Sequence, residues 1–242
     1  MVDFRNITPC GGNCTECEYF QRNECSGCNQ NGGKCVKLWE GNCKICDCCR
    51  KHDVKFCGLC KEFPCEWLKK TLTWDKDGIK HLYKLKTEYQ ERSAEFSLYL
   101  PALWKKIGTH GIMTLSTCSE KRVTSRPMSM IVIDGRFYCQ TDQTYLKYRQ
   151  ILKNPNVAVC HKNFSIEGTC QCIGRPLENK NDFFIHAFKK YFYGSYKAYS
   201  DLQNEILLEI VPTLIYSWNY KLTKPYMEYF DFVNFIYRRE EK

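Results

Sequence analysis

The sequence contains no run that approaches the roughly 20 consecutive apolar residues needed to cross a bilayer as a helix. Its N-terminus, MVDFRNITPCGG, also lacks the apolar stretch of a secretory signal peptide. Hydrophobic residues make up 43% and charged residues 26% of the 242, which is ordinary for a globular protein of one or two domains. We therefore expect a soluble cytoplasmic protein rather than a membrane-spanning, fibrous or disordered one.

Residues 1–65 have few aliphatic side chains and instead hold 13 of the 18 cysteines. Because no secretory signal is seen, disulfides are disfavoured and metal binding is the better interpretation. A segment with so little apolar material needs another source of stability, and we expect that source to be metal. Buried structural thiols without metal are the alternative.

Several of these cysteines stand in pairs separated by two residues, a spacing that lets both sulfurs reach one metal ion. Zinc sites and iron–sulfur clusters both use four cysteines, so the spacing leaves the metal and the ligand set of each site open. The pairs are Cys14–Cys17, Cys25–Cys28, Cys43–Cys46, Cys46–Cys49 and Cys57–Cys60.

The spacing of Cys43, Cys46 and Cys49 resembles the start of a bacterial ferredoxin motif, but the next cysteine, Cys57, comes too late for its fourth ligand. Residues 8–68 as a whole resemble the small cysteine-rich family DUF3795. The motifs that carry this resemblance are Cys10-Gly-Gly-Asn-Cys14-Thr-Glu-Cys17, Cys25-Ser-Gly-Cys28, Cys43-Lys-Ile-Cys46 and Phe56-Cys57-Gly-Leu-Cys60-Lys-Glu-Phe-Pro-Cys65. The resemblance implies metal binding without naming the metal. The candidate ligands are Cys10, Cys14, Cys17, Cys25, Cys28, Cys43, Cys46, Cys49, Cys57, Cys60 and Cys65.

The rest of the chain is predicted to be helical at first and then rich in strands. Leu82, Leu85, Tyr89 and Arg92 recur at helical spacing. Further on, Asp134-Gly135 between two β-rich runs predicts a tight hairpin. Strands are expected at 112–118, 123–133, 136–141, 157–161, 166–173 and 206–211, and helices at 144–153 and 179–202. This order predicts a small antiparallel barrel.

Arg126, Thr141 and Lys147 are predicted to converge on an anion. Arg126 belongs to an expected strand, Thr141 ends another, and Lys147 lies near the start of the helix that follows. Arginine binds an anion with two parallel hydrogen bonds, and the amides that open a helix favour negative charge. A phosphate monoester suits such a site. An arginine and a lysine that only face water are the alternative.

Residues 108–220 resemble the pyridoxamine 5'-phosphate oxidase-like split barrel that binds FMN, in particular its general-stress-protein branch. The matching motifs include Met113-Thr-Leu-Ser-Thr117, Ser125-Arg126-Pro127-Met128, Asp134-Gly135-Arg136-Phe137-Tyr138, Asn154-Pro155-Asn156-Val157, Glu167-Gly168-Thr169 and Ile210-Val211-Pro212. The predicted fold class is therefore α+β. It comprises a cysteine-rich, metal-stabilised domain at 1–66, a helical connector at 67–107 and a split β-barrel domain at 108–242.

The resemblance also implies roles for single residues. Arg126, Thr141 and Lys147 would hold the FMN phosphate. Met128 and Ser129 would line the flavin ring. The family binds FMN between two subunits, which implies a homodimer in which Gln171 and Trp218 reach the flavin of the partner.

One feature separates the chain from pyridoxamine 5'-phosphate oxidase itself. The arginine and histidine that such an oxidase uses to bind its substrate have no match near the C-terminus, so we do not expect oxidation of vitamin B6. Some split barrels bind haem instead, and His161 and His186 are conceivable ligands, although a lone histidine is more often structural.

A flavin domain next to a cysteine-dense domain has a physical logic if the metal is iron. FMN accepts one or two electrons, and an iron–sulfur cluster passes one at a time. We therefore predict an FMN-dependent oxidoreductase that exchanges electrons with iron–sulfur clusters, of the [4Fe–4S] type, and acts on an unknown small molecule or carrier. Its many thiols suit an anaerobe. The alternative is a zinc-stabilised FMN-binding sensor or interaction protein without electron transfer.

Positive charge is concentrated in the second part of the chain. Residues 1–65 hold 9 basic against 8 acidic residues, whereas residues 66–242 hold 27 against 19. This excess suits a phosphate-bearing ligand or an acidic partner such as a ferredoxin-like electron carrier. Since the lysines are dispersed, binding of nucleic acid is not expected.

Overall fold

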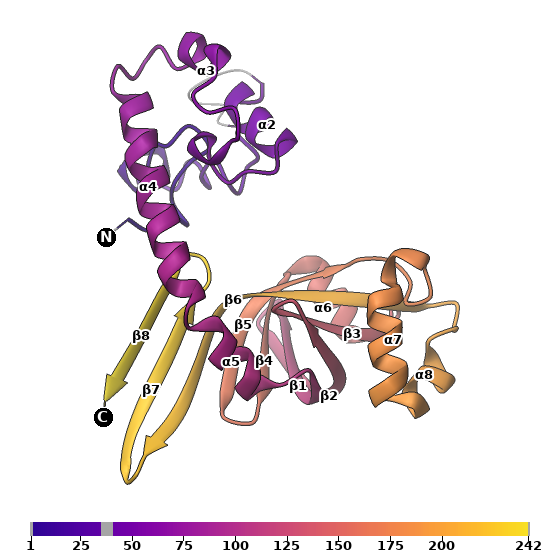
Figure 1. The fold of residues 1–242 in the computed structure, drawn as a ribbon. Coiled ribbons are helices and arrows are strands. Elements are labelled where there is room, and N and C mark those ends of the chain that lie inside the picture. The colour runs from indigo at the N-terminus through magenta and orange to yellow at the C-terminus, as the bar shows by residue number, and fades with distance from the viewer. Residues whose placement is uncertain (1, 35–40, 242) are drawn as a thin grey trace. The chain divides into compact units, whose positions relative to one another are not determined.

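The computed structural model describes residues 2–34 and 41–241 of the chain. The chain divides into two compact units, Met1–Glu95 and Phe96–Lys242. The first unit consists of short helices and irregular segments, and the second is built on a β-sheet (Figure 1). None of the helices in the described ranges is long and apolar enough to cross a bilayer.

Most helices of the first unit are short and follow the cysteine motifs. α2 buries Ile45, Cys46 and Cys49 and ends with two basic residues, which suit the negative end of a helix. α3 begins after Cys65, whose sulfur accepts a hydrogen bond from the Leu68 amide at 3.4 Å. The elements are η1 (Cys14–Glu16), α1 (Glu18–Gln21), α2 (Lys44–Lys51), η2 (Cys57–Leu59), α3 (Glu66–Thr71) and α4 (Gly78–Ser97).

The first unit has a small apolar core that α4 completes. The rings of Phe4 and Phe56 are parallel with centroids 6.3 Å apart, and Tyr89 meets both edge-on. Leu82 and Leu85 are 0% and 2% exposed in the same cluster. The expected apolar face of this helix is confirmed. The aliphatic side chains that the cysteine-rich segment lacks therefore come from the residues expected to form only a connector.

The second unit is a closed barrel of six antiparallel strands, as predicted. The strand order is β3-β2-β1-β4-β5-β6, and β6 pairs back with β3 to close the barrel, while β7 and β8 extend the sheet beyond β6. The strands are β1 (His110–Ser119), β2 (Arg122–Ile133), β3 (Arg136–Asp142), β4 (Asn156–His161), β5 (Phe164–Cys172), β6 (Glu205–Lys221), β7 (Lys224–Asp231) and β8 (Ile236–Glu241).

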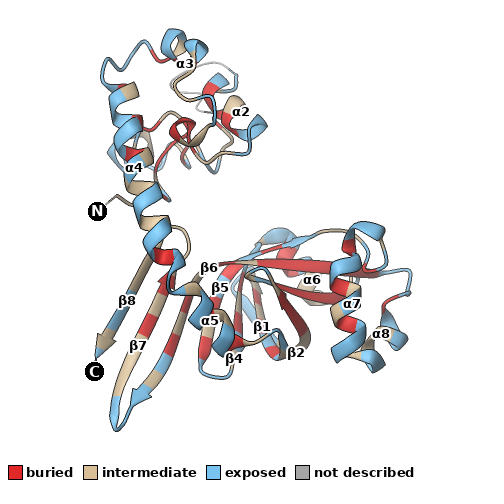
Figure 2. Ribbon diagram, in the orientation of Figure 1, coloured by how far each residue is buried: buried red, intermediate tan, exposed pale blue. Residues whose placement is uncertain are grey.

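Helices cover parts of this barrel, and its interior is filled by alternate residues of the strands. The helices are α5 (Leu100–Ile107), α6 (Leu146–Lys153), η3 (Asn179–Asn181), α7 (Asp182–Tyr191) and α8 (Tyr193–Tyr199). Figure 2 shows the buried residues along the strands and on one side of α7. There, Phe184 and Phe188 pack against Ile131, Tyr138 and Leu207 of the sheet.

The hairpin between β2 and β3 turns at Asp134 and Gly135, as predicted. Both residues have positive φ angles, 48° and 75°. Two successive residues in this region are typical of the tight turns whose twist matches that of the strands. The turn places Arg136 opposite Ile133 and brings the two strands into register.

The prediction that a strand ends before Pro212 is wrong, because β6 continues to Lys221. The register between β5 and β6 shifts at Glu167 and Gly168, and Pro212 lies opposite Gly168 at that bulge. Proline is tolerated at a bulge because its missing N–H interrupts no regular ladder there. A Cβ on Gly168 would lie 2.5 Å from the Val211 oxygen, so this close approach requires glycine.

The prediction of one long helix over 179–202 is also wrong. The chain leaves the helical conformation at Phe192, with φ −133° and ψ 49°, and α7 and α8 are therefore separate. The Phe192 ring packs against Phe188, with centroids 5.4 Å apart. This packing holds the aromatic side chain against the barrel cluster at the break in the helix.

Two strands were not expected, β7 and β8. They are held by an aromatic cluster in which Phe96 lies edge-on to Phe230, Phe232 and Phe235. Tyr99 and Tyr237 stack with centroids 4.0 Å apart. The charged C-terminal segment is thus anchored by aromatic residues that precede its charges in the sequence.

Candidate functional site

Arg126 points into one end of the barrel. It lies two and four positions before Met128 and the fully buried Met130 in β2. Because every second residue of a strand is on the same face, the Arg126 side chain starts on the inward face. One terminal nitrogen, Nη1, donates to the Leu115 carbonyl at 3.1 Å and to Thr117 Oγ1 at 2.9 Å. The other, Nη2, donates to Thr124 Oγ1. Burial lowers the pKa of Arg126 from its ordinary value, as expected of a cation partly removed from water.

Thr141 lies near the end of β3 and is 4% exposed. Within the part of the chain that the structure describes, its hydroxyl oxygen has no hydrogen-bond partner. A buried polar group without a partner costs on the order of 1–3 kcal/mol. The buried hydroxyl oxygen therefore has hydrogen-bonding capacity that the described residues do not use.

Lys147 stands in the first turn of α6, close to the same end. Burial lowers the pKa of its ammonium, and the positive charge of Arg126 lowers it further. Cys139, Glu205 and Asp142 act on the Lys147 pKa in the opposite direction. The ammonium also lies 4.5 Å from the centre of the Tyr145 ring.

Arg126 and Lys147 lie close enough for the charge of one to affect the other, and the carboxylates of Glu205 and Asp142 also act on Lys147. No carboxylate forms an ion pair with Arg126 or Lys147 among the residues that the structure describes. Two half-buried cations that repel one another, next to an unsatisfied hydroxyl, are the environment that an anion stabilises. Among the sequence-predicted residues, Arg126 and Lys147 lie near one another, and Thr141 directly precedes Asp142, which acts on the Lys147 pKa.

Glu205 is a buried acid beside this site that the sequence analysis missed. It is 5% exposed at the start of β6, opposite Asp142. Burial, with a smaller contribution from Asp142, raises its pKa to about 7, while Lys147 acts to lower it. Its only sequence signal was a charged residue at the edge of an apolar strand.

The four other predicted flavin contacts are spread over the barrel. Met128 is on the face of Arg126 and packs partly against the barrel core, while Ser129 is on the opposite face. Gln171 donates through Nε2 to Glu209 Oε2 at 2.6 Å. Trp218 belongs to β6, is 41% exposed and follows Ser217, which pairs with the first residue of β5. Gln171, in contrast, is near the last residue of β5. Gln171 and Trp218 thus do not lie together within one chain, and their predicted contact with a partner's flavin stays a prediction.

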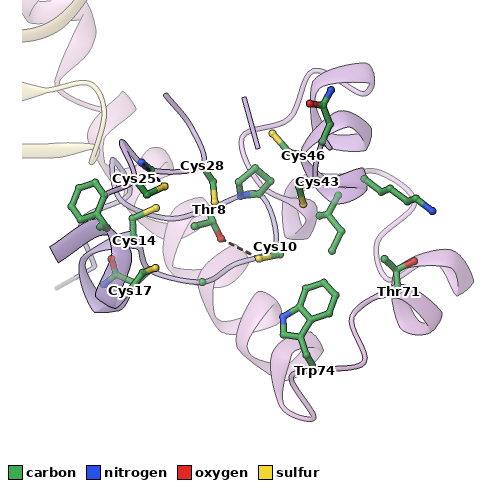
Figure 3. Close-up of a pocket in the computed structure, with 18 residues that line it drawn as sticks. Thr8, Cys10, Cys14, Cys17, Cys25, Cys28, Cys43, Cys46, Thr71 and Trp74 are labelled. Atoms are coloured by element: carbon green, nitrogen blue, oxygen red, sulfur yellow. Dashed lines mark hydrogen bonds between the residues drawn. The ribbon is translucent and has the colours of Figure 1, made fainter. Parts of the chain in front are cut away.

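A second candidate site lies in the first unit, where a cavity of about 810 Å³ is lined by thiols (Figure 3). Trp74 and Thr71 also line it. The thiols of Cys14 and Cys28 lie close together, and Cys28 lowers the pKa of Cys14 to about 6 against the opposing effect of burial. The cysteines that line the cavity are Cys10, Cys14, Cys17, Cys25, Cys28, Cys43 and Cys46.

Polar groups surround the sulfurs of this cavity. The Gly27 amide and the Asn31 side chain donate to Cys25 Sγ at 3.4 and 3.2 Å. Arg50 Nη2 lies 3.7 Å from Cys46 Sγ. Arg50 acts to lower the pKa of Cys46, but burial has the larger effect and raises it overall.

The remaining predicted ligands form a second group. The Cys49 thiol donates to the Pro9 carbonyl at 3.6 Å, and the nearby Cys57 together with burial raises the pKa of Cys49. Burial raises the pKa of Cys48, and the nearby thiols of Cys57, Cys60 and Cys65 raise it further. Cys48, which the predicted ligand set omits, therefore belongs with this group.

The described cysteines are free thiols. Within residues 2–34 and 41–241, no three His, Cys, Asp or Glu side chains converge as metal ligands; Cys35 lies outside these ranges. The donor set is thus chemically suited to a thiophilic metal, while the thiols in this structure are not drawn together around one point. The predicted metal stays a prediction.

The molecule therefore combines a closed six-stranded barrel, in which Arg126 and Lys147 lie near one another, with a cysteine-rich unit. Residues 101–219 match the family model of pyridoxamine 5'-phosphate oxidase. Residues 6–70 match the family described as a protein of unknown function, DUF3795. The second unit is accordingly a pyridoxamine 5'-phosphate oxidase-like split barrel, and a DUF3795 domain precedes it. No curated protein matches the chain.

Solved structures resemble the barrel. General Stress Protein 26 from Bacillus anthracis is 25% identical and covers 49% of this chain and 92% of its own, with a TM-score of 0.38. A pyridoxamine 5'-phosphate oxidase-related, FMN-binding protein from Nostoc punctiforme is 13% identical and covers 62% and 94%, with a TM-score of 0.40. The heme storage protein HutZ from Vibrio cholerae is 13% identical and covers 53% and 87%, with a TM-score of 0.38.

Proposed function

We propose that the protein is a redox flavoprotein that binds FMN by its phosphate at Arg126, Thr141 and Lys147. The observation that carries this proposal is the pair of partly buried cations, Arg126 and Lys147, for which the described residues show no ion pair, together with the buried and unpartnered hydroxyl of Thr141. The match of the barrel to pyridoxamine 5'-phosphate oxidase supports it.

Each residue has a separate part in holding the cofactor. Arg126 offers donors in a planar fork, Lys147 offers a mobile point charge, and Thr141 offers a hydroxyl. Met128 and Ser129 line the flavin ring. We further propose a homodimer in which Gln171 and Trp218 approach the flavin of the partner. When bound, FMN supplies transfer of one or two electrons.

The test compares FMN with riboflavin, which lacks the phosphate, in titrations of the full-length protein. Charged hydrogen bonds contribute about 1.5–3 kcal/mol each, so Arg126→Ala or Lys147→Ala should weaken FMN roughly ten- to a hundredfold. Riboflavin should bind the wild-type protein poorly and respond little to either change. Lys153→Ala is the matched control, because Lys153 is on the same helix but pairs with the exposed Glu120. Equal affinity for the two flavins would refute the phosphate site.

For the first unit, we propose that the cysteines bind iron–sulfur clusters of the [4Fe–4S] type that exchange electrons with FMN. Two separate groups of thiols and the donors around Cys25 and Cys46 support metal binding. Protein purified without oxygen should contain iron and acid-labile sulfide. Zinc without iron would instead indicate an FMN-binding sensor or interaction protein.

Electron exchange has its own test. A low-potential one-electron donor should reduce FMN quickly in the wild-type protein and more slowly in the Cys14→Ser, Cys28→Ser double variant with FMN still bound. Equal rates would contradict electron transfer through these thiols. The basic surplus of the second unit suits an acidic electron carrier as the natural donor or acceptor.

A further inference from the structure

We propose that Gln150 is a positioning residue for the phosphate site, because it holds two threonine hydroxyls in the orientation that Arg126 needs. This inference rests on the proposed FMN phosphate site and adds to it a residue that makes no direct contact with the anion. The geometry of the amide and of the two hydroxyls carries it.

Gln150 is 1% exposed on the inner face of α6. Its Oε1 accepts from Thr117 Oγ1 and from Thr124 Oγ1, both at 2.7 Å. Its Nε2 donates to the Arg122 carbonyl at 2.8 Å. Since a carbonyl can only accept, the bond to Arg122 determines which end of the amide carries nitrogen. The oxygen of the amide therefore faces the hydroxyls.

This arrangement decides where the hydroxyl protons point. A threonine hydroxyl has one proton and two lone pairs. When both hydroxyls donate to Gln150, their lone pairs are left to accept from Arg126. The structure shows these two bonds, from Nη1 to Thr117 at 2.9 Å and from Nη2 to Thr124.

The protein thereby holds the guanidinium in place while some of its N–H donors stay free to bind a ligand. Thr117, Thr124 and the Leu115 carbonyl take three of its five N–H donors in the described residues. Two donors remain, which is the number that a bidentate contact with phosphate requires. An arginine whose fork is oriented in advance loses less freedom when the anion binds.

The experiment changes the amide and the hydroxyls separately and measures dissociation constants for FMN and riboflavin in the full-length protein. Gln150→Met keeps the volume of the side chain but removes its acceptor. Thr124→Val removes one hydroxyl, and Thr124→Ser is its matched control, because it keeps the hydroxyl. Gln150→Met and Thr124→Val should each weaken FMN by about tenfold, in the range of measured couplings between neighbouring residues. Thr124→Ser should stay within about twofold of wild type, and riboflavin should change little throughout.

A double-mutant cycle separates positioning from general stability. If Gln150 acts through Arg126, Gln150→Met should weaken FMN no further when Arg126→Ala is already present. An undiminished loss in that background, or equal losses for FMN and riboflavin, would overturn the role of Gln150 and leave the phosphate site standing. Equal affinity of the wild-type protein for the two flavins would overturn both. Should Gln150→Met not fold, the contrast between Thr124→Val and Thr124→Ser decides alone, and equal FMN affinities of that pair would overturn the inference.

Discussion

Glu205 is a single residue whose pKa is raised by burial, although the nearby Lys147 acts to lower it. Its carboxyl is buried next to Asp142, and its pKa is raised to about 7 from an ordinary value of 4.5. A raised pKa means that the folded protein binds the proton more tightly than the unfolded chain does. The free energy of unfolding should therefore fall as pH rises from about 4.5 to 7, because the unfolded chain loses this proton more readily than the folded protein does.

We predict that Glu205→Gln removes this dependence. The melting temperature of the variant, relative to wild type, should be higher at pH 8 than at pH 5, since glutamine carries no charge at either pH. Thermal unfolding at both pH values measures this. Glu167→Gln on the exposed side of β5 is the control and should shift equally at both. A difference between variant and wild type that does not vary with pH would show that Glu205 is not buried as an acid.

At the scale of elements, the bulge between β5 and β6 lets one long strand serve both the barrel and its extension. The first part of β6 pairs with β3, and the last part pairs with β7. Pro212 and Gly168 face each other at the shift in register between these parts. A side chain at Gly168 would collide with the Val211 carbonyl, which is backbone and cannot rotate away.

We therefore expect Gly168→Ala to lower the free energy of unfolding by about 1–3 kcal/mol, the usual cost of overpacking. Gly194→Ala in α8 is a matched control, because no atom lies within 4 Å of the added carbon. It should be neutral or stabilise by roughly 0.5–1 kcal/mol, since alanine is the better helix former. Urea-induced unfolding of both variants measures the contrast. A Gly168→Ala protein as stable as wild type would mean that the bulge can relax.

At the scale of the whole molecule, the two units should depend on different sources of stability. The barrel has an extensive apolar core, whereas the core of the first unit is small and includes Leu82 and Leu85 of α4. Structural metal sites can contribute about 10–16 kcal/mol to folding. If the thiols bind metal, the first unit should depend on it.

Removal of metal by a chelator, or by acid for a cluster, should therefore unfold residues 1–95 and leave the barrel folded. Limited proteolysis would then cut throughout the first unit, while the fragment that contains the barrel resists and still binds FMN. Metal restored before proteolysis should protect the first unit again. An unchanged digestion pattern in metal-free protein would show that the small apolar core suffices.

Local pattern was enough to predict much of the fold. The alternation of apolar residues placed six barrel strands, and Asp134-Gly135 predicted the hairpin, because turn and strand preferences are properties of neighbouring residues. Residue type and position first pointed to Arg126, Thr141 and Lys147 as anion ligands, and the family resemblance then assigned them to the FMN phosphate. The errors at Pro212 and Phe192 arose where a contact from elsewhere overrode the local signal: a bulge opposite Gly168 and a packed aromatic ring.

The sequence by itself therefore determined the two kinds of segment, the barrel class and the basic residues that suit a phosphate. Only the tertiary structure decided that the thiols divide into two groups, that the Thr141 hydroxyl is buried without a partner among the described residues, and that Gln150 reaches Thr117 and Thr124. The reason is physical. Periodicity encodes which face of an element is buried, but hydrogen bonds across the barrel depend on the pairing of strands and helices far apart in the chain, which no local pattern carries.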